Sequence, residues 1–128
     1  MVLDTLPVLS LADDPARLAG ELGASFRTFG FALIRDHGID SALIAEGWRQ
    51  TRLLFDLPET EKRGYFAEHL AGARGYTPFG TEIAKGAKAH DLKEFCHVGR
   101  DPPTGHPLAP SMPPNVWPEQ LPGFRETF

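Results

Sequence analysis

The segment Phe29–Ile39 reads FGFALIRDHGI, and its centre, Phe31–Ile34, is an unbroken apolar run. Gly30 precedes this run, and the charged pair Arg35–Asp36 follows it. A short apolar run bounded in this way is typical of a strand that is buried on both faces. Segments with regularly spaced apolar residues lie on both sides of the run, and each needs an apolar surface to cover. We therefore expect this strand to lie at the centre of the fold.

A helix is predicted immediately before this strand. Asp14 can accept hydrogen bonds from free backbone amides, and Pro15 suits the first helical position. Large apolar residues then recur with helical spacing, as on one face of a helix: Leu18, Leu22, Phe26 and Phe29. Gly30 can adopt a left-handed conformation and so marks the end of the helix. The pattern predicts a helix over residues 15–29.

Two further helices are predicted after the strand. Asp40 or Ser41 can cap the first of them, which must end by Leu57 because a proline follows. Its apolar face comprises Leu43, Ile44, Trp48, Thr51, Leu54 and Phe55. A short helix is expected over Pro58–Tyr65, since its acidic residues come early and its basic residues late, as the helix dipole favours.

The remaining pattern predicts short strands joined by loops. Leu6–Leu11 alternates loosely and indicates a strand, and Leu92–Val98 alternates as well. Residues 72–90 hold four glycines and little periodicity, which indicates a loop with short extended pieces. The predicted fold class is α+β, a short sheet covered by two main helices.

Prolines are concentrated late in the chain, where eight of the twelve fall between Pro102 and Pro122. Such a segment is either a disordered linker or an extended coil that lies on another surface. Val116, Trp117 and Phe124 are large apolar residues that favour the docked coil. We therefore divide the chain into a domain over residues 1–100, a proline-rich coil over 101–122, and the start of a helix over 123–128.

Composition excludes several classes of protein. The 128 residues carry a net charge of −4, which argues against a dedicated nucleic-acid binder. No apolar stretch approaches the length of a membrane span, and the first residues lack a basic region of the kind that begins a signal peptide. The single cysteine, Cys96, suits a reducing compartment, so we expect a cytoplasmic protein.

The sequence offers few residues for chemistry. None of the five histidines belongs to a His-x-Asp or His-x-Glu pair, so we expect no iron site and no catalytic residue in this chain. Cys96 and His97 are neighbours on a predicted strand and should point to opposite faces. Arg74 and Tyr76 lie in a glycine-flanked loop, where they either contact a polar ligand or are only a solvated arginine and a loop anchor.

Several segments together resemble the N-terminal part of the isopenicillin N synthase-like family of non-haem iron oxygenases. The pieces occur in the family's order and cover nearly the whole chain: Leu6–Leu9, Gly30–Phe31, Asp36–Ile39, Phe55–Pro58, Glu61–Lys62, Gly75–Tyr76, Asp91–Glu94, Asn115–Pro118 and Pro122–Arg125.

The resemblance implies an oxygenase parent that uses Fe(II), O2 and 2-oxoglutarate. In this family the iron ligands and the 2-oxoglutarate site lie in a C-terminal jelly-roll (double-stranded β-helix) domain, so the resemblance implies that this catalytic barrel is absent from the chain. It also implies that the loop around Gly75 borders the substrate mouth. Arg74 and Tyr76 are therefore the candidates for contact with a small-molecule substrate.

Two functions remain open from the sequence. The chain is either the scaffold and substrate-mouth part of an oxygenase that is inactive by itself, or a free-standing binding or regulatory module with the same fold. We expect the isolated 128 residues to expose an apolar surface and therefore to self-associate.

Overall fold

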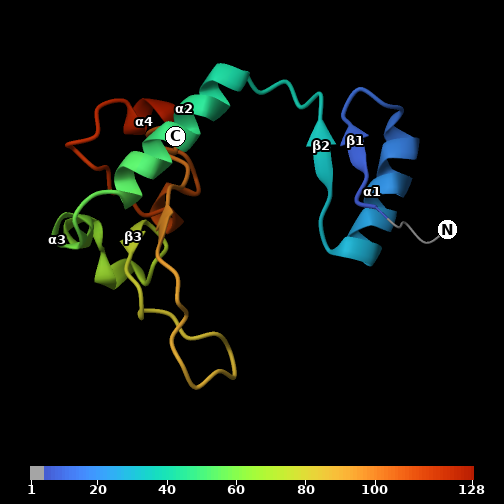
Figure 1. The fold of residues 1–128 in the computed structure, drawn as a ribbon. Helices are drawn as coiled ribbons and strands as arrows, with labels where there is room; N and C mark the ends of the chain where they lie inside the picture. Colours follow the sequence, from blue (N-terminus) through green and yellow to red (C-terminus); the bar gives the residue numbers. More distant parts are fainter. Residues whose placement is uncertain (1–4) are drawn as a thin grey trace. The chain divides into compact units, whose positions relative to one another are not determined.

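Strands β1 (Val8–Ser10) and β2 (Leu33–Arg35) pair in parallel, and helix α1 (Pro15–Phe29) connects them (Figure 1). The structure is a computed structural model that describes residues 5–128. In the register of the pair, Val8 lies opposite Leu33. Parallel strands need a crossover connection, and α1 supplies it by packing against β1. The FGFALIRDHGI segment thus contributes the second strand of a β-α-β unit.

The predicted bounds of α1 are confirmed. The Asp14 carboxylate accepts hydrogen bonds from the backbone N–H groups of Ala16 and Arg17, at 3.1 and 3.0 Å. Gly30 ends the helix with φ of +80°, a left-handed conformation that costs glycine little. Because both ends depend on local chemistry, the sequence was sufficient to place them.

The prediction that the Phe31–Ile34 run is buried on both faces is wrong. Phe31 is 54% exposed, Leu33 is 46% exposed and Ile34 is 36% exposed. The physical reason is that, among the described residues, this sheet has two strands, and α1 packs against β1. Strand β2 therefore lies at an edge of the sheet, although its composition suits a strand within one.

The contacts divide the chain into two compact units, Met1–Asp40 and Ser41–Phe128. The fold is α+β, as predicted, but each unit has its own two-stranded sheet in place of one short sheet under two helices. Helix α1 packs on β1 within the first unit, and α2 (Ser41–Phe55) packs on α4 (Phe124–Thr127) within the second. The domain boundaries at residues 100 and 122 stay predictions.

The second unit begins with α2 and α3 (Glu59–Lys62), followed by 3-10 turns η1 (Arg63–Tyr65) and η2 (Glu68–Leu70). The predicted helix over residues 58–65 is thus split between α3 and η1. Strands β3 (Gly75–Thr77) and β4 (Phe95–His97) then pair antiparallel, with Tyr76 opposite Cys96. A further 3-10 turn, η3 (Ala109–Ser111), precedes α4.

The apolar face predicted for α2 is buried only towards its C-terminal end. Leu54 is 2% exposed, whereas Trp48 is 74% exposed and Leu43 is 49% exposed. The reason is that the C-terminal residues of the chain contact the second half of α2, where the Gln50 side chain donates to the Pro122 carbonyl oxygen at 3.0 Å. The apolar face predicted for α2 is therefore covered in its second half and largely exposed over the first two turns.

Candidate functional site

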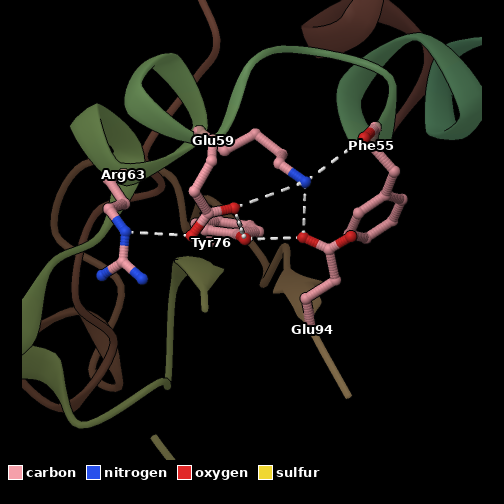
Figure 2. Close-up of polar contacts among 6 residues, drawn as sticks. Phe55, Glu59, Arg63, Tyr76 and Glu94 are labelled. Carbon is pink, nitrogen blue, oxygen red and sulfur yellow. Dashed lines mark hydrogen bonds and ion pairs between the residues drawn. The ribbon is translucent and has the colours of Figure 1, made fainter. Parts of the chain in front are cut away.

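A buried group of charged and polar side chains joins α3, β3 and the segment before β4 (Figure 2). At its centre is Lys62, whose side chain is only 8% exposed. Its Nζ lies 2.7 Å from Glu94 Oε2 and 3.7 Å from Glu59 Oε2, and it donates to the Phe55 carbonyl oxygen at 3.3 Å. A buried ammonium requires such partners, because desolvation of an unpaired charge is very costly.

Tyr76 completes this cluster from β3. Its side chain is fully buried, and its hydroxyl lies 2.6 Å from Glu94 Oε2 and 3.1 Å from Glu59 Oε2. The Lys62 Nζ lies 5.5 Å from the centre of the Tyr76 ring, within range of a cation–π interaction. Burial raises the pKa of Tyr76, and hydrogen bonds to the two carboxylates raise it further. The hydroxyl therefore keeps its proton and acts as a donor.

Glu94 is held in the opposite protonation state. Burial opposes its ionisation, but hydrogen bonds from Lys62 and Tyr76, together with the positive charge of Lys62, outweigh burial and lower its pKa. Arg63 Nε pairs with the second oxygen of Glu59 at 2.9 Å, nearer the surface. The cluster therefore holds an ionised carboxylate, an ammonium and a protonated phenol in fixed places, an arrangement that stabilises structure and offers no free base.

Gly75 has a conformation that no other residue could adopt without strain. Its φ is +74°, and a Cβ atom there would lie 2.4 Å from the Tyr65 carbonyl oxygen and 3.1 Å from Val116 Cβ. The backbone of β3 therefore passes closely between η1 and the proline-rich segment. This close approach fixes the loop on which both sequence-predicted site residues lie.

Arg74 is partly buried beside this strand. Its Nη1 donates to the Ala73 carbonyl oxygen at 2.6 Å, while its Nε is buried without a hydrogen-bond partner among the described residues. A Cβ atom added to Gly99 would lie 2.1 Å from Arg74 Cζ, so the guanidinium occupies the space that a side chain at position 99 would fill. Arg74 is thus positioned by packing against the backbone.

The structure gives the two sequence-predicted residues different surroundings. The Tyr76 hydroxyl is engaged by carboxylates, and the Arg74 guanidinium lies along Gly99. Substrate contact by Arg74 and Tyr76 stays a prediction. Sequence reasoning did not identify Lys62 and Glu94 as partners, although both lie in the quoted family segments. Both segments contain other charged residues, so the sequence carried no signal that singled out this pair.

Cys96 lines an apolar cavity of about 300 Å³ between α2, β4 and α4. Burial raises the pKa of its thiol to about 11, so the thiolate is scarce near neutral pH. His97 also borders this cavity, but its Nδ1 lies 2.6 Å from the Gly72 carbonyl oxygen. As the strand alternation predicted, the two side chains do not form a thiolate–imidazole pair.

Within residues 5–128, no three His, Cys, Asp or Glu side chains are grouped as a metal site would require. No described helix combines the length and apolarity needed to cross a bilayer.

A family model described as the N-terminal region of a non-haem dioxygenase in morphine synthesis matches residues 5–120. The chain belongs to this family. The resemblance seen in the sequence is thereby confirmed, and the Lys62–Tyr76–Glu94 cluster lies wholly within the matched residues of this dioxygenase N-terminal region.

Individual relatives agree with this assignment. The chain is 32% identical over 120 residues to validamycin A dioxygenase of Streptomyces hygroscopicus subsp. limoneus, a match that covers 90% of this chain and 33% of that protein. It is 30% identical over 142 residues to a 2-oxoglutarate-dependent dioxygenase of Dothideomycetidae sp., covering 100% of this chain and 36% of that protein. The chain thus spans about a third of the length of these curated relatives.

A solved structure shows the same fold. A Caulobacter crescentus protein assigned to the 2OG-Fe(II) oxygenase family superposes with a TM-score of 0.76 at 45% identity, covering 95% of this chain and 41% of that one. The dioxygenase N-terminal region of this chain is therefore similar in three dimensions as well as in sequence.

Proposed function

We propose that this chain is the scaffold and substrate-mouth portion of a non-haem oxygenase that oxidises a small molecule with Fe(II), O2 and 2-oxoglutarate. The observation that carries the proposal is the family match over residues 5–120. The name of the Dothideomycetidae relative, a 2-oxoglutarate-dependent dioxygenase, supports the choice of cosubstrate. Fe(II) and 2-oxoglutarate would be held by residues other than those described, and the single cysteine supports a cytoplasmic location.

Within this function, Arg74 is the group that meets an anionic part of the substrate. Arg74 Nε has no hydrogen-bond partner among the described residues, and a guanidinium can form charge-assisted hydrogen bonds with a carboxylate. Tyr76 contributes to the mouth by fixing the loop, because its hydroxyl is held by Glu94 and Glu59. Direct contact between Tyr76 and substrate would require this hydroxyl to leave both carboxylates.

The reaction is tested with the full-length protein, supplied with Fe(II), ascorbate and 2-oxoglutarate and a panel of small carboxylic acids and their neutral amides. We expect release of succinate that depends on Fe(II) and increases with one member of the panel. The matched control is the same protein treated with a chelator. If Fe(II) and 2-oxoglutarate neither support succinate release nor raise the melting temperature, the oxygenase proposal fails, and a free-standing binding module becomes the better account.

The role of Arg74 is tested with the substrate found in that panel. Arg74→Ala should raise KM about 10- to 100-fold, the value of a lost charge-assisted hydrogen bond. Arg100→Ala is the matched control, because Arg100 is an exposed arginine on the same unit. An equal rise in both variants would show a general effect of charge and would refute a specific contact by Arg74.

A further inference from the structure

The Asn115 side chain binds the backbone of Gly99 through both of its polar atoms. Asn115 Oδ1 accepts from the Gly99 N–H at 2.8 Å, and Asn115 Nδ2 donates to the Gly99 carbonyl oxygen at 2.8 Å. Nδ2 also donates to Asp101 Oδ1 at 2.8 Å. The side-chain amide therefore satisfies the peptide groups of Gly99 as a neighbouring strand would, and it fixes that residue's position.

Gly99 in turn forms the surface on which Arg74 lies. A Cβ atom at Gly99 would come within 2.1 Å of Arg74 Cζ, 2.2 Å of Nη2 and 2.6 Å of Nε. Any side chain at position 99 would therefore displace the guanidinium. Gly99 has no left-handed φ, so its backbone conformation does not require glycine. Glycine is needed there because the Arg74 guanidinium occupies the space of a side chain.

The residue after Asn115 holds the other side of the same loop. Val116 packs against Gly75, the residue next to Arg74, where an added Cβ atom would lie 3.1 Å from Val116 Cβ. Asn115 and Val116 are consecutive residues of the proline-rich segment. Asn115 therefore fixes Gly99, on which the Arg74 guanidinium lies, and Val116 fixes Gly75, which follows Arg74. The guanidinium is oriented by packing on Gly99 and by the hydrogen bond from Nη1 to the Ala73 carbonyl oxygen, while its buried Nε has no partner among the described residues.

We propose that Asn115 is a positioning residue for Arg74: by holding Gly99 in place, it sets the direction in which the guanidinium is presented to an anionic group of the substrate. The effect of this positioning on substrate binding rests on the function proposed for Arg74. The positioning itself is a property of the chain and can be measured without any substrate.

The first test measures how fast phenylglyoxal modifies Arg74 in the full-length protein, by peptide mass spectrometry, with the exposed Arg52 of α2 as the internal reference. Gly99→Ala should raise the Arg74 rate several-fold, because the new methyl group occupies the space of the guanidinium. Asn115→Ala should raise it as well, because Gly99 is no longer fixed. Gly64→Ala is the matched control, since Gly64 has open space and no left-handed φ. An Arg74 rate that Asn115→Ala leaves unchanged, or that Gly64→Ala raises equally, would overturn the proposal.

If Asn115→Ala fails to fold, Asn115→Asp keeps the test decisive, because its carboxylate can still accept from the Gly99 N–H but cannot donate to the Gly99 carbonyl oxygen. Acetate, compared with chloride at equal ionic strength, is the probe for an anion site at Arg74. Protection by acetate in the wild type, lost in Gly99→Ala, supports both the positioning and the proposed function. A raised Arg74 rate with no protection by acetate in the wild type supports positioning alone and counts against the carboxylate contact.

A double-mutant cycle separates positioning from general support of the fold. With the substrate identified in the panel, Asn115→Ala should raise KM in the wild-type background and have no further effect in the Arg74→Ala background. Equal effects in both backgrounds would mean that Asn115 acts independently of Arg74, which would overturn the inference.

Discussion

The ammonium group of Lys62 lies 2.7 Å from the carboxylate of Glu94, although 32 positions separate them in the sequence. Both side chains are largely buried, at 8% and 17% exposed. The pair joins the short helix α3 to the segment that leads into β4. Because Tyr76 of β3 donates to the same Glu94 oxygen, one carboxylate holds together three parts of the second unit.

Lys62→Met should lower the free energy of unfolding by about 3 kcal/mol, because it leaves Glu94 as a buried charge without its counter-ion. The matched control is Lys93→Met, since Lys93 is 53% exposed and pairs with Glu82 and Asp91 at the surface. That change should lower the free energy of unfolding far less, because water screens an exposed ion pair. Urea denaturation of both variants makes the comparison, and equal losses would refute the special role of Lys62.

Acid should weaken the fold through Glu94. Its folded pKa lies below the ordinary value of 4.5, so its contribution to stability is complete above that pH and is lost as the pH falls through the lower folded value. Glu46 also has a lowered pKa, about 2, because of hydrogen bonds from Arg49 and Gln50. The difference between wild type and Glu94→Gln therefore isolates Glu94.

Unfolding free energies measured from pH 7 to pH 2 test this. We expect the difference between the two proteins to be constant above the ordinary carboxylate pKa and to shrink below it. A difference that grows as the pH falls would contradict a lowered pKa.

Gly75→Ala should destabilise the protein through both strain and a clash. Gly75 and Gly86 both have a positive φ, +74° and +84°, but only Gly75 lacks space for a Cβ atom. Gly86→Ala should therefore cost about 1–2 kcal/mol for the backbone alone. Gly75→Ala should cost about 1–3 kcal/mol more, the range for overpacking. Thermal and urea denaturation of both variants measure the difference, and equal losses would show that Tyr65 and Val116 can move aside.

The isolated 128-residue chain should self-associate through the first two turns of α2. Trp48 is 74% exposed and borders, with Ile44 and Phe128, a shallow apolar cavity of about 240 Å³. Trp48→Glu should shift the chain towards monomer in sedimentation velocity, because exposed apolar patches of this kind promote association. Leu92→Glu is the control, since Leu92 is 93% exposed and borders none of the described cavities. A monomeric wild-type chain would refute the prediction.

Local chemistry explains why some elements were predictable. The start and end of α1 depend on Asp14, Pro15 and Gly30, which act within a few residues of themselves, and the structure agrees with the predicted bounds. Burial depends on distant neighbours, and here prediction failed. The Phe31–Ile34 run has the composition of an inner strand, yet within its own unit one strand flanks it.

In the candidate site, too, local features were predictable and contacts between distant segments were not. Arg74 and Tyr76 stood out because they lie between glycines, and this drew attention to the correct loop. The partners of Tyr76 come from α3 and the approach to β4, so no local pattern could reveal them. The resemblance to a known family did select the segments that contain Lys62 and Glu94, but it could not show that these segments meet.

The two hydrogen bonds between Asn115 and Gly99 also determine how attachment of the proline-rich segment can be observed in solution. The backbone hydrogen bonds given for the amides of that segment are made within it, for example His106 N–H to the Pro103 carbonyl oxygen, so they do not report its attachment. The Gly99 amide, which donates to Asn115 Oδ1, lies outside that segment and is protected only while the segment is attached. The exchange rate of this one proton therefore reports the attachment and release of the proline-rich segment.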